Sequence, residues 1–208
     1  MVSQPVVARN GDTVVMVHGL AARPIVLFPL ARTLKSSFGQ IINWGYPSLW
    51  SRIETHGKRF AELLQQMDEA GDGGRIHLVG HSMGGIIARL ALADYLPRRL
   101  GRFVMIAPPN RGSRYARHLA PHLGRLSPPI AQLTDEHGSF VCSLPPPSGP
   151  EIGIIAAKSD FMVSLQNTRL GCEADHIVLP GLHSSVLWRR ETAVQVRHFI
   201  EHGCFSRQ

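Results

Sequence analysis

A serine stands at the centre of the pentapeptide 80–84, GHSMG, with one glycine two residues before it and another two residues after. The expected strand 75–79 precedes this pentapeptide, and a segment with helical periodicity, 83–96, follows it directly. On a sharp turn from strand to helix, a serine Oγ is raised above the carboxyl edge of a sheet, and glycines remove Cβ atoms that would clash there. We therefore expect Ser82 to be a nucleophile. The alternative is that Ser82 only caps the following helix.

A serine nucleophile needs a general base, and the chain contains 11 histidines. The base is expected on a loop at the carboxyl edge of the sheet, after the acid in chain order. His183 meets both conditions, because it follows the strand expected at 176–179 after a short turn and precedes the last helix. The alternative is a surface histidine that caps this helix. Other histidines are expected inside or at the start of a strand, beside the serine, or on the last helix: His77, His176, His81, His198 and His202.

The acid that orients this histidine must also lie at the carboxyl edge of the sheet. Asp160 comes three residues after the strand expected at 152–157 and so meets this condition. Asp175 precedes the next strand, which places it at the opposite edge, and we keep it as the second candidate. Four other acidic residues are set aside because they are expected inside a helix, or in or beside a proline-rich segment with no strand end to aim them: Asp94, Asp135, Glu136 and Glu151.

An oxyanion hole is expected where the first strand, 13–18, ends in His18-Gly19. The backbone N–H of Leu20, after this strand, and the N–H of Met83, after the nucleophile, would be its two donors. The alternative is an ordinary turn that ends the strand. We expect His18 to shape this loop and not to act as a base.

The elements that must position these residues alternate along the chain, which predicts an α/β fold with a mostly parallel sheet of about six strands and helices on both faces. In the last helix, Val194, Phe199 and Ile200 are expected to lie on the sheet. The proline-rich segment 108–150 interrupts the alternation and is expected to overhang the site within a single domain, 1–208. The expected strands are 13–18, 40–44, 75–79, 102–107, 152–157 and 176–179; the expected helices are 24–37, 52–69, 83–96, 113–122, 129–137 and 185–202.

The composition excludes several classes of protein. A chain of 208 residues with 44% hydrophobic residues and three cysteines is neither disordered nor a disulfide scaffold, and no apolar run is long enough for a membrane span. The net charge of +7 comes from scattered arginines, so no nucleic-acid partner is expected. The N-terminus, MVSQPVVARNGD, lacks the pattern of a secretory signal, so we expect a cytoplasmic protein; a secreted chain with its signal removed is the alternative.

No metal or organic cofactor is expected. His118 and His122 are four residues apart but lack the glutamate of an H-E-x-x-H zinc motif, and Pro121 lies between them. The cysteines have no metal-ligand spacing. Whether they pair, and how many chains associate, is left open by the sequence.

The chain resembles the α/β-hydrolase superfamily, and within it the small, lid-poor bacterial serine esterases and lipases. Four stretches carry this resemblance: 14–24, 77–85, 159–170 and 179–205. The resemblance implies a reduced parallel sheet without the leading antiparallel hairpin and without a separate cap domain. In such relatives the acid often occurs as Asp-Gly-x-Val, whereas this chain has phenylalanine at position 161. If that position requires a positive φ, the loop must rearrange; otherwise the Phe161 ring is expected to narrow the pocket.

These residues together predict hydrolysis of carboxylic esters through an acyl-enzyme on Ser82, with a small-molecule ester as the only expected partner. A mostly apolar set of expected pocket walls favours apolar acyl or aryl esters. A serine acyltransferase would use the same residues, and a binding module that retained the fold without catalysis is the other alternative. The walls are expected from 20–27, 44–50, 108–150 and 161–165.

Overall fold

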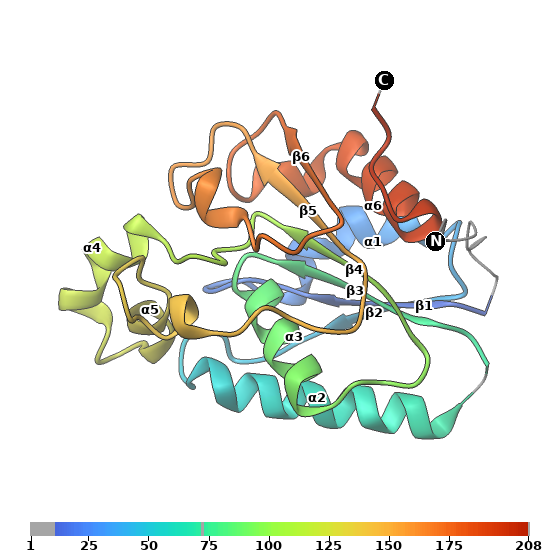
Figure 1. The fold of residues 1–208 in the computed structure, drawn as a ribbon, viewed down its shortest axis with the longest axis horizontal. Coiled ribbons are helices and arrows are strands. Elements are labelled where there is room, and N and C mark those ends of the chain that lie inside the picture. Colours follow the sequence, from blue (N-terminus) through green and yellow to red (C-terminus); the bar gives the residue numbers. More distant parts are fainter. Residues whose placement is uncertain (1–10, 72, 208) are drawn as a thin grey trace.

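The structure is a computed structural model and describes residues 11–71 and 73–207 (Figure 1). Residues 1–10, on which most of the prediction about a secretory signal depends, lie outside the described residues. In the described part of the chain, no helix combines the length and the apolar character that crossing a membrane requires.

Six parallel strands form one sheet in the order β2-β1-β3-β4-β5-β6. The predicted α/β fold is therefore confirmed. The chain runs outward from β1 to β2 and then returns to the other side of β1, so the loops after β1 and β3 flank the point where the strand order reverses. Ligands of open parallel sheets bind at such a point, beyond the carboxyl ends of the strands. The strands are β1 (Thr13–Val17), β2 (Gln40–Trp44), β3 (Ile76–His81), β4 (Leu100–Ile106), β5 (Ile152–Ala157) and β6 (Asp175–Leu179).

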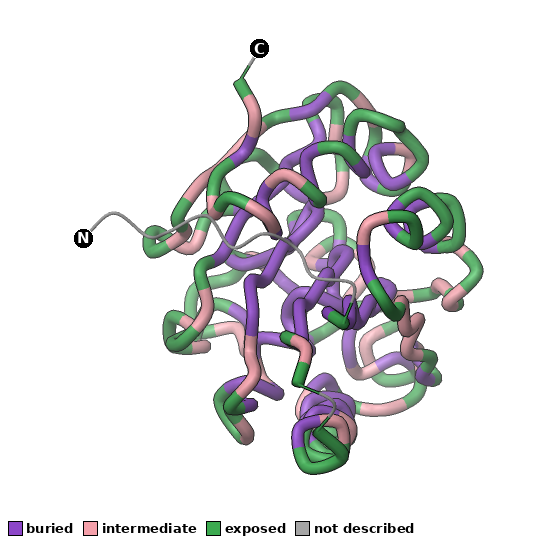
Figure 2. Tube along the Cα trace, turned by 90° about the vertical axis from the view of Figure 1, so that its right-hand side faces the viewer, coloured by how far each residue is buried: buried purple, intermediate pink, exposed green. Residues whose placement is uncertain are grey.

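Helices cover both faces of this sheet because successive strand residues point to opposite sides and both sides are apolar. Val15 and Val17 of β1 face helices α2 (Ile53–Ala70) and α3 (Met83–Asp94). The intervening β1 residues pack toward helices α1 (Phe28–Leu34) and α6 (Arg190–His202) on the other face. Figure 1 shows these two pairs of helices on either side of the strands, and Figure 2 shows the buried residues concentrated in the sheet.

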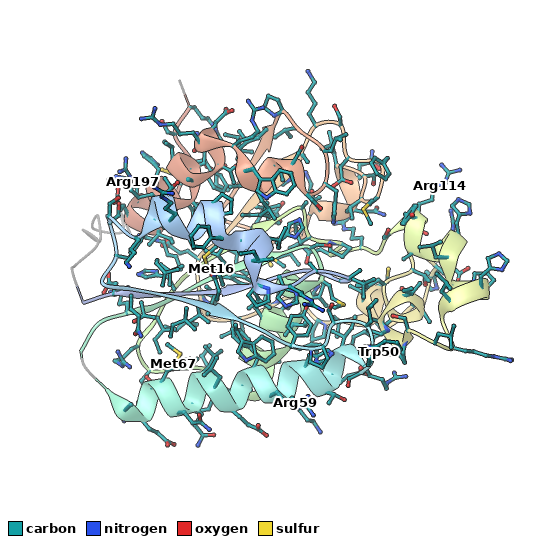
Figure 3. The ribbon with its side chains drawn as sticks, turned by 180° about the vertical axis from the view of Figure 1, so that it is seen from behind. Met16, Trp50, Arg59, Met67, Arg114 and Arg197 are labelled. Carbon is teal, nitrogen blue, oxygen red and sulfur yellow. The ribbon has the colours of Figure 1, made fainter. Side chains whose placement is uncertain are left out.

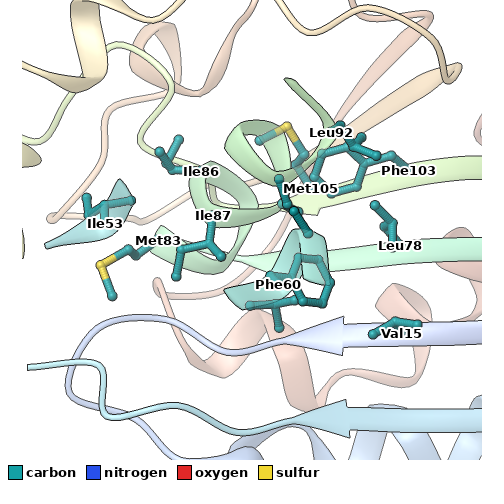
Figure 4. Close-up of a cluster of buried hydrophobic side chains, with 14 of the residues drawn as sticks. Val15, Ile53, Phe60, Leu78, Met83, Ile86, Ile87, Leu92, Phe103 and Met105 are labelled. Atoms are coloured by element: carbon teal, nitrogen blue, oxygen red, sulfur yellow. The ribbon is translucent and has the colours of Figure 1, made fainter. Parts of the chain in front are cut away.

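The larger apolar core lies between the sheet and the pair α2 and α3. Figure 4 shows Phe60 of α2 among Val15, Leu78 and Phe103 of three neighbouring strands, and all four side chains are fully buried. Burying an aromatic ring of this size stabilises a fold by roughly 1.5–3 kcal/mol. The same core includes Met83, so the first turn of α3, directly after Ser82, is anchored by apolar packing.

The outer helices differ from their predicted bounds. The predicted helix 24–37 is a 3₁₀ turn, Pro24–Leu27, followed by α1, because Pro29 is tolerated only in the first turn of an α-helix. The predicted helix 185–202 is likewise divided into the 3₁₀ turn Ser185–Trp188 and α6, separated by the extended residue Arg189.

The prediction that Val194 lies on the sheet is wrong, because 40% of it is exposed. The face of α6 that packs on the sheet is formed by Ala193, Val196, Phe199 and Ile200. These residues recur at the three- and four-residue spacing of one helical stripe, and Val194 lies outside it. The predictions for Phe199 and Ile200 are correct.

The segment 108–150 contains two helices at the carboxyl edge of the sheet, α4 (Arg114–Leu123) and α5 (Pro128–Gln132). Helix α5 is shorter than its predicted range, 129–137, because Leu133 leaves the helix and accepts a hydrogen bond from the backbone N–H of Ser113. Figure 3 shows Arg114, at the start of α4, at the same end of the molecule as Trp50, in the loop before α2.

The return of this segment to the sheet is held by one buried arginine. Arg89 of α3 donates hydrogen bonds to the backbone carbonyls of Leu144 and Pro145. Proline has no backbone N–H, so a proline-rich stretch can be held by hydrogen bonds only through its carbonyl oxygens. The polyproline-containing return is therefore attached to the helix that begins at Ser82.

Candidate active site

Ser82 lies between β3 and α3 with φ 52° and ψ −125°, outside the conformations that most residues with a side chain adopt. The two flanking glycines explain how the chain accommodates this turn. A Cβ on Gly80 would lie 2.6 Å from Gly85 Cα, and a Cβ on Gly84 would lie 2.2 Å from the carbonyl oxygen of Val17. Both positions therefore require glycine, as the pentapeptide predicts.

Replacing Gly84 with alanine is expected to destabilise the fold by about 3 kcal/mol, since the new methyl group would collide with the carbonyl oxygens of Val17 and His18. Gly85→Ala is the matched control, because a Cβ there meets the flexible end of Met105 at 2.9 Å and gains helix propensity. Urea unfolding of both variants checks this. Equal stabilities for the two would show that the first turn of α3 can move away from β1.

The structure brings together the three residues predicted as nucleophile, base and acid. The Oγ of Ser82 is 2.8 Å from Nε2 of His183, and Nδ1 of His183 is 2.6 Å from Oδ2 of Asp160. A carboxylate only accepts hydrogen bonds, so Nδ1 carries the imidazole proton and Nε2 accepts from the serine hydroxyl. The side chains of Asp160 and His183 are 2% and 7% exposed, so water does not compete strongly for these bonds.

The second oxygen of the Asp160 carboxylate is fixed by its own loop. Oδ1 accepts hydrogen bonds from the backbone N–H groups of Met162, at 2.8 Å, and Val163, at 3.0 Å. This arrangement is the common turn in which an aspartate bonds the backbone two or three residues further on. The carboxylate is thereby oriented before any substrate binds.

Two polar residues of the segment 108–150 hold this loop from outside, and both were missed by the sequence analysis. Ser113 donates a hydrogen bond through Oγ to the carbonyl of Met162 at 2.6 Å and also accepts from the N–H of Ala116 as the N-cap of α4. Asn110 donates through Nδ2 to the carbonyl of Thr168 at 2.7 Å. The sequence offers one signal for Ser113, a serine at the start of an expected helix. This signal predicts a helix cap but not the hydrogen bond to Met162.

Asp175, the second candidate for the acid, lies at the amino end of β6 and has other partners. Its carboxylate accepts hydrogen bonds from the backbone N–H groups of His176, at 2.7 Å, and Phe205, at 2.8 Å, and is paired with Arg207. In a parallel sheet this end of β6 is opposite to the edge that carries Ser82. Asp175 therefore attaches the end of the chain to the sheet.

The two backbone groups predicted as an oxyanion hole lie after β1 and at the first residue of α3. The N–H of Met83 has no acceptor within the helix, as at every helix start. The loop that contains Leu20 approaches the serine closely, since a Cβ on Gly19 would lie 3.0 Å from Ser82 Cβ. The hydroxyl of Tyr46 donates to the carbonyl of His18 at 2.7 Å and holds this loop. No sequence signal indicates that contact.

His18 is buried, and its Nδ1 lies 2.9 Å from the backbone carbonyl oxygen of Gly19. Its imidazole stacks on the Tyr46 ring at a centroid distance of 4.3 Å. Burial lowers the pKa of His18, so the ring stays neutral under this loop. Its surroundings fit the predicted role in shaping the loop.

A cavity of about 410 Å³ opens beside Ser82 and His183. Its walls are largely apolar and come from the loop after β1, from α4 and α5, and from the loop that follows Asp160. The range 44–50 contributes only Leu49 among the described residues. The apolar wall residues include Leu20, Val26, Leu49, Leu119, Leu123, Ile130, Leu133, Met162 and Val163.

Neither expectation for Phe161 holds. Among the described residues, positive φ outside glycine is confined to Ala21, Ser82 and Ala107, so position 161 needs no unusual backbone conformation. The Phe161 ring does not line the cavity and is 68% exposed. It packs edge to face against Tyr115 of α4, and the chain turns so that Met162 reaches the cavity instead.

The fold and this arrangement at the carboxyl edge of the sheet define an α/β hydrolase. The family model described as "Alpha/beta hydrolase family" matches residues 14–194, and the chain belongs to that family.

Individual relatives agree with this assignment. A Mycoplasma pneumoniae protein carrying the name esterase/lipase 3 is 30% identical over 114 residues, which cover 50% of this chain and 39% of that protein. The chain thus matches less than half the length of this relative. The mature form of the Bacillus licheniformis lipase BlEst2 has a similar fold, with a TM-score of 0.69 and 16% identity over 96% of this chain and 94% of the lipase. A lipase-esterase related protein from Clostridium acetobutylicum gives a TM-score of 0.66 and 14% identity, covering 93% and 97% of the two chains.

Proposed function

We propose that this chain hydrolyses carboxylic esters of apolar acyl or aryl groups through an acyl-enzyme on Ser82. The observation that supports this most directly is the His183 imidazole, which bridges Ser82 Oγ at 2.8 Å and Asp160 Oδ2 at 2.6 Å beside an apolar cavity. Membership of the α/β-hydrolase family agrees with hydrolysis in general.

In the first half of the proposed reaction, His183 Nε2 takes the proton of the Ser82 hydroxyl while Oγ forms a bond to the ester carbonyl carbon. The carbonyl oxygen becomes negative and is held by the N–H groups of Leu20 and Met83, aided by the positive end of α3. Asp160 stabilises the positive imidazolium that forms. The ester C–O bond then breaks, and the alcohol leaves with the proton from Nε2.

In the second half, a water molecule replaces the alcohol. His183 Nε2 takes a proton from this water as its oxygen attacks the acyl carbon, and the same N–H groups hold the new oxyanion. The bond between the acyl carbon and Ser82 Oγ breaks, and Nε2 returns the proton to the serine. The carboxylic acid is released, and no metal or organic cofactor takes part in the proposed cycle.

The cavity walls support the substrate class. Most side chains around the cavity are aliphatic. Its polar lining residues are few: His81, Ser82, Ser113, Tyr115, His183 and Ser184. An apolar acyl or aryl group is stabilised in such a site by removal from water. Because helices α4 and α5 supply much of the wall, we propose that the segment 108–150 belongs functionally to the site, within a single domain.

The test is covalent labelling combined with a panel of nitrophenyl esters of graded acyl length. We expect a fluorophosphonate to add once per folded chain, with peptide mapping placing the adduct on Ser82, and we expect the esters to release nitrophenol and free acid. Folded protein without an adduct would instead support the binding module. Added alcohols that capture most of the acyl group ahead of water would support an acyltransferase.

A further inference from the structure

His81, the residue before the nucleophile, contacts the general base of the proposed function through a different set of atoms. Its ring is buried at the end of β3, with Nε2 at 3.0 Å from the backbone carbonyl oxygen of His183. The centroids of the His81 and His183 rings are 5.1 Å apart. Two consecutive residues therefore form hydrogen bonds with His183: Ser82 bonds to its side chain, and His81 bonds to its backbone carbonyl.

The hydrogen bond fixes which nitrogen of His81 carries the proton. The carbonyl oxygen of His183 only accepts, so Nε2 is the donor. Nδ1 of His81 is buried and has no hydrogen-bond partner among the described residues, which suits an unprotonated nitrogen better than an unsatisfied N–H. Burial, together with the nearby His183, lowers the pKa of His81 to about 3, so the ring stays neutral at ordinary pH.

His183 needs such support because it lies in a loop and not in a regular element. The loop between β6 and the following 3₁₀ turn is attached to the loop after β5 by one backbone bond, from the N–H of Ser159 to the carbonyl of Gly181 at 3.0 Å. The remaining bonds of Leu182 stay local: it exchanges hydrogen bonds with Ser185, and its carbonyl accepts from the backbone N–H of Val186 at 3.2 Å. The bond from His81 joins this loop directly to the strand that carries the nucleophile.

We propose that His81 is a positioning residue, whose donated hydrogen bond to the His183 carbonyl keeps the imidazole within hydrogen-bonding reach of Ser82. Proton transfer depends steeply on this geometry, and a displacement of about 1 Å can lower a rate by up to about 10²-fold. The neutral form of His81 also matters, because a second positive ring would oppose formation of the His183 imidazolium. The inference rests on the proposed ester hydrolysis, in which His183 is the base.

The test compares His81→Leu, which removes the donor, with His81→Gln, whose side-chain amide can donate to the same carbonyl. For a nitrophenyl ester of intermediate acyl length, we expect the leucine variant to lose about 10- to 30-fold in kcat with KM within about twofold of wild type. The glutamine variant is expected to keep at least about one third of the wild-type kcat. Labelling of Ser82 by a fluorophosphonate should slow in parallel with kcat.

Two further readouts separate positioning from a general structural effect. The proton NMR signal of the His183 Nδ1–H, bonded to Asp160, should move or broaden in the leucine variant and stay near its wild-type position in the glutamine variant. The acid limb of the pH–rate profile should have the same midpoint in wild type and His81→Gln, because His81 does not titrate there. If the leucine variant does not fold, His81→Met, which is unbranched, replaces it.

Three results would overturn the inference: wild-type kcat in the leucine variant, equal losses in the leucine and glutamine variants, or a change confined to KM. A wild-type protein that is neither labelled at Ser82 nor active on esters would instead refute the proposed function. The two failures are therefore distinguishable, because the second is seen before any His81 variant is made.

Discussion

Replacing Ser82 with alanine is expected to lower kcat for ester hydrolysis by about 10⁶-fold and to abolish labelling by a fluorophosphonate. The variant removes the only atom that forms the covalent bond in the proposed cycle, and the remaining base and oxyanion donors have no nucleophile to assist. Hydrolysis of nitrophenyl esters under saturating substrate, together with intact-mass measurement after labelling, checks both effects.

The control for this variant is Ser36→Ala. Ser36 lies just after α1, where its hydroxyl donates to the carbonyl of Thr33 in an exposed turn. We expect wild-type kcat for this control and full labelling at Ser82. The fold of Ser82→Ala is verified by its urea unfolding curve. Activity above about one hundredth of wild type in pure Ser82→Ala would contradict the assignment of the nucleophile.

Replacing Asp160 with asparagine is expected to lower kcat by about 10⁴-fold while the fold is retained. The asparagine oxygen can still accept from the N–H groups of Met162 and Val163, which leaves its NH₂ group facing Nδ1 of His183. An NH₂ group only donates, so it favours the imidazole tautomer with the proton on Nε2. In that tautomer Nε2 cannot accept the proton of Ser82.

Asp175→Asn is the matched control, because the same substitution is made in the candidate that the structure places at the other end of β6. We expect near-normal kcat and a modest loss of stability from the weakened contact with Arg207. Both variants are measured for kcat, KM and urea unfolding. A large loss of kcat in Asp175→Asn, with none in Asp160→Asn, would reverse the choice of acid.

The residues that form the centre of the site could be predicted because their positions depend on local sequence and on parallel-sheet geometry. GHSMG between a strand and a helix fixes the backbone at Ser82, since the glycines are required by contacts with nearby backbone atoms. Asp160 and His183 each follow a strand, and the carboxyl ends of parallel strands share one edge. Knowing the order of strands and loops was enough to place these three side chains together.

The residues that support the site could not be predicted in this way. Tyr46, His81, Asn110 and Ser113 act through hydrogen bonds to backbone carbonyls that are 28, 102, 58 and 49 residues away in sequence. Every residue has the same backbone carbonyl group, so the sequence does not indicate which carbonyl accepts a given hydrogen bond. The prediction for Phe161 failed for a related reason. Its ring packs against Tyr115 of α4, and this contact forms only in the folded chain.

The sequence by itself determined the parallel α/β fold, the strained turn at Ser82 and the positions of Asp160 and His183 after strand ends, because apolar periodicity and glycine sterics act over a few residues. Only the tertiary structure decided which side chains line the cavity and which bonds hold the loops around it. These features depend on how separate elements pack, and packing is settled by the shapes of side chains that meet only in the folded chain.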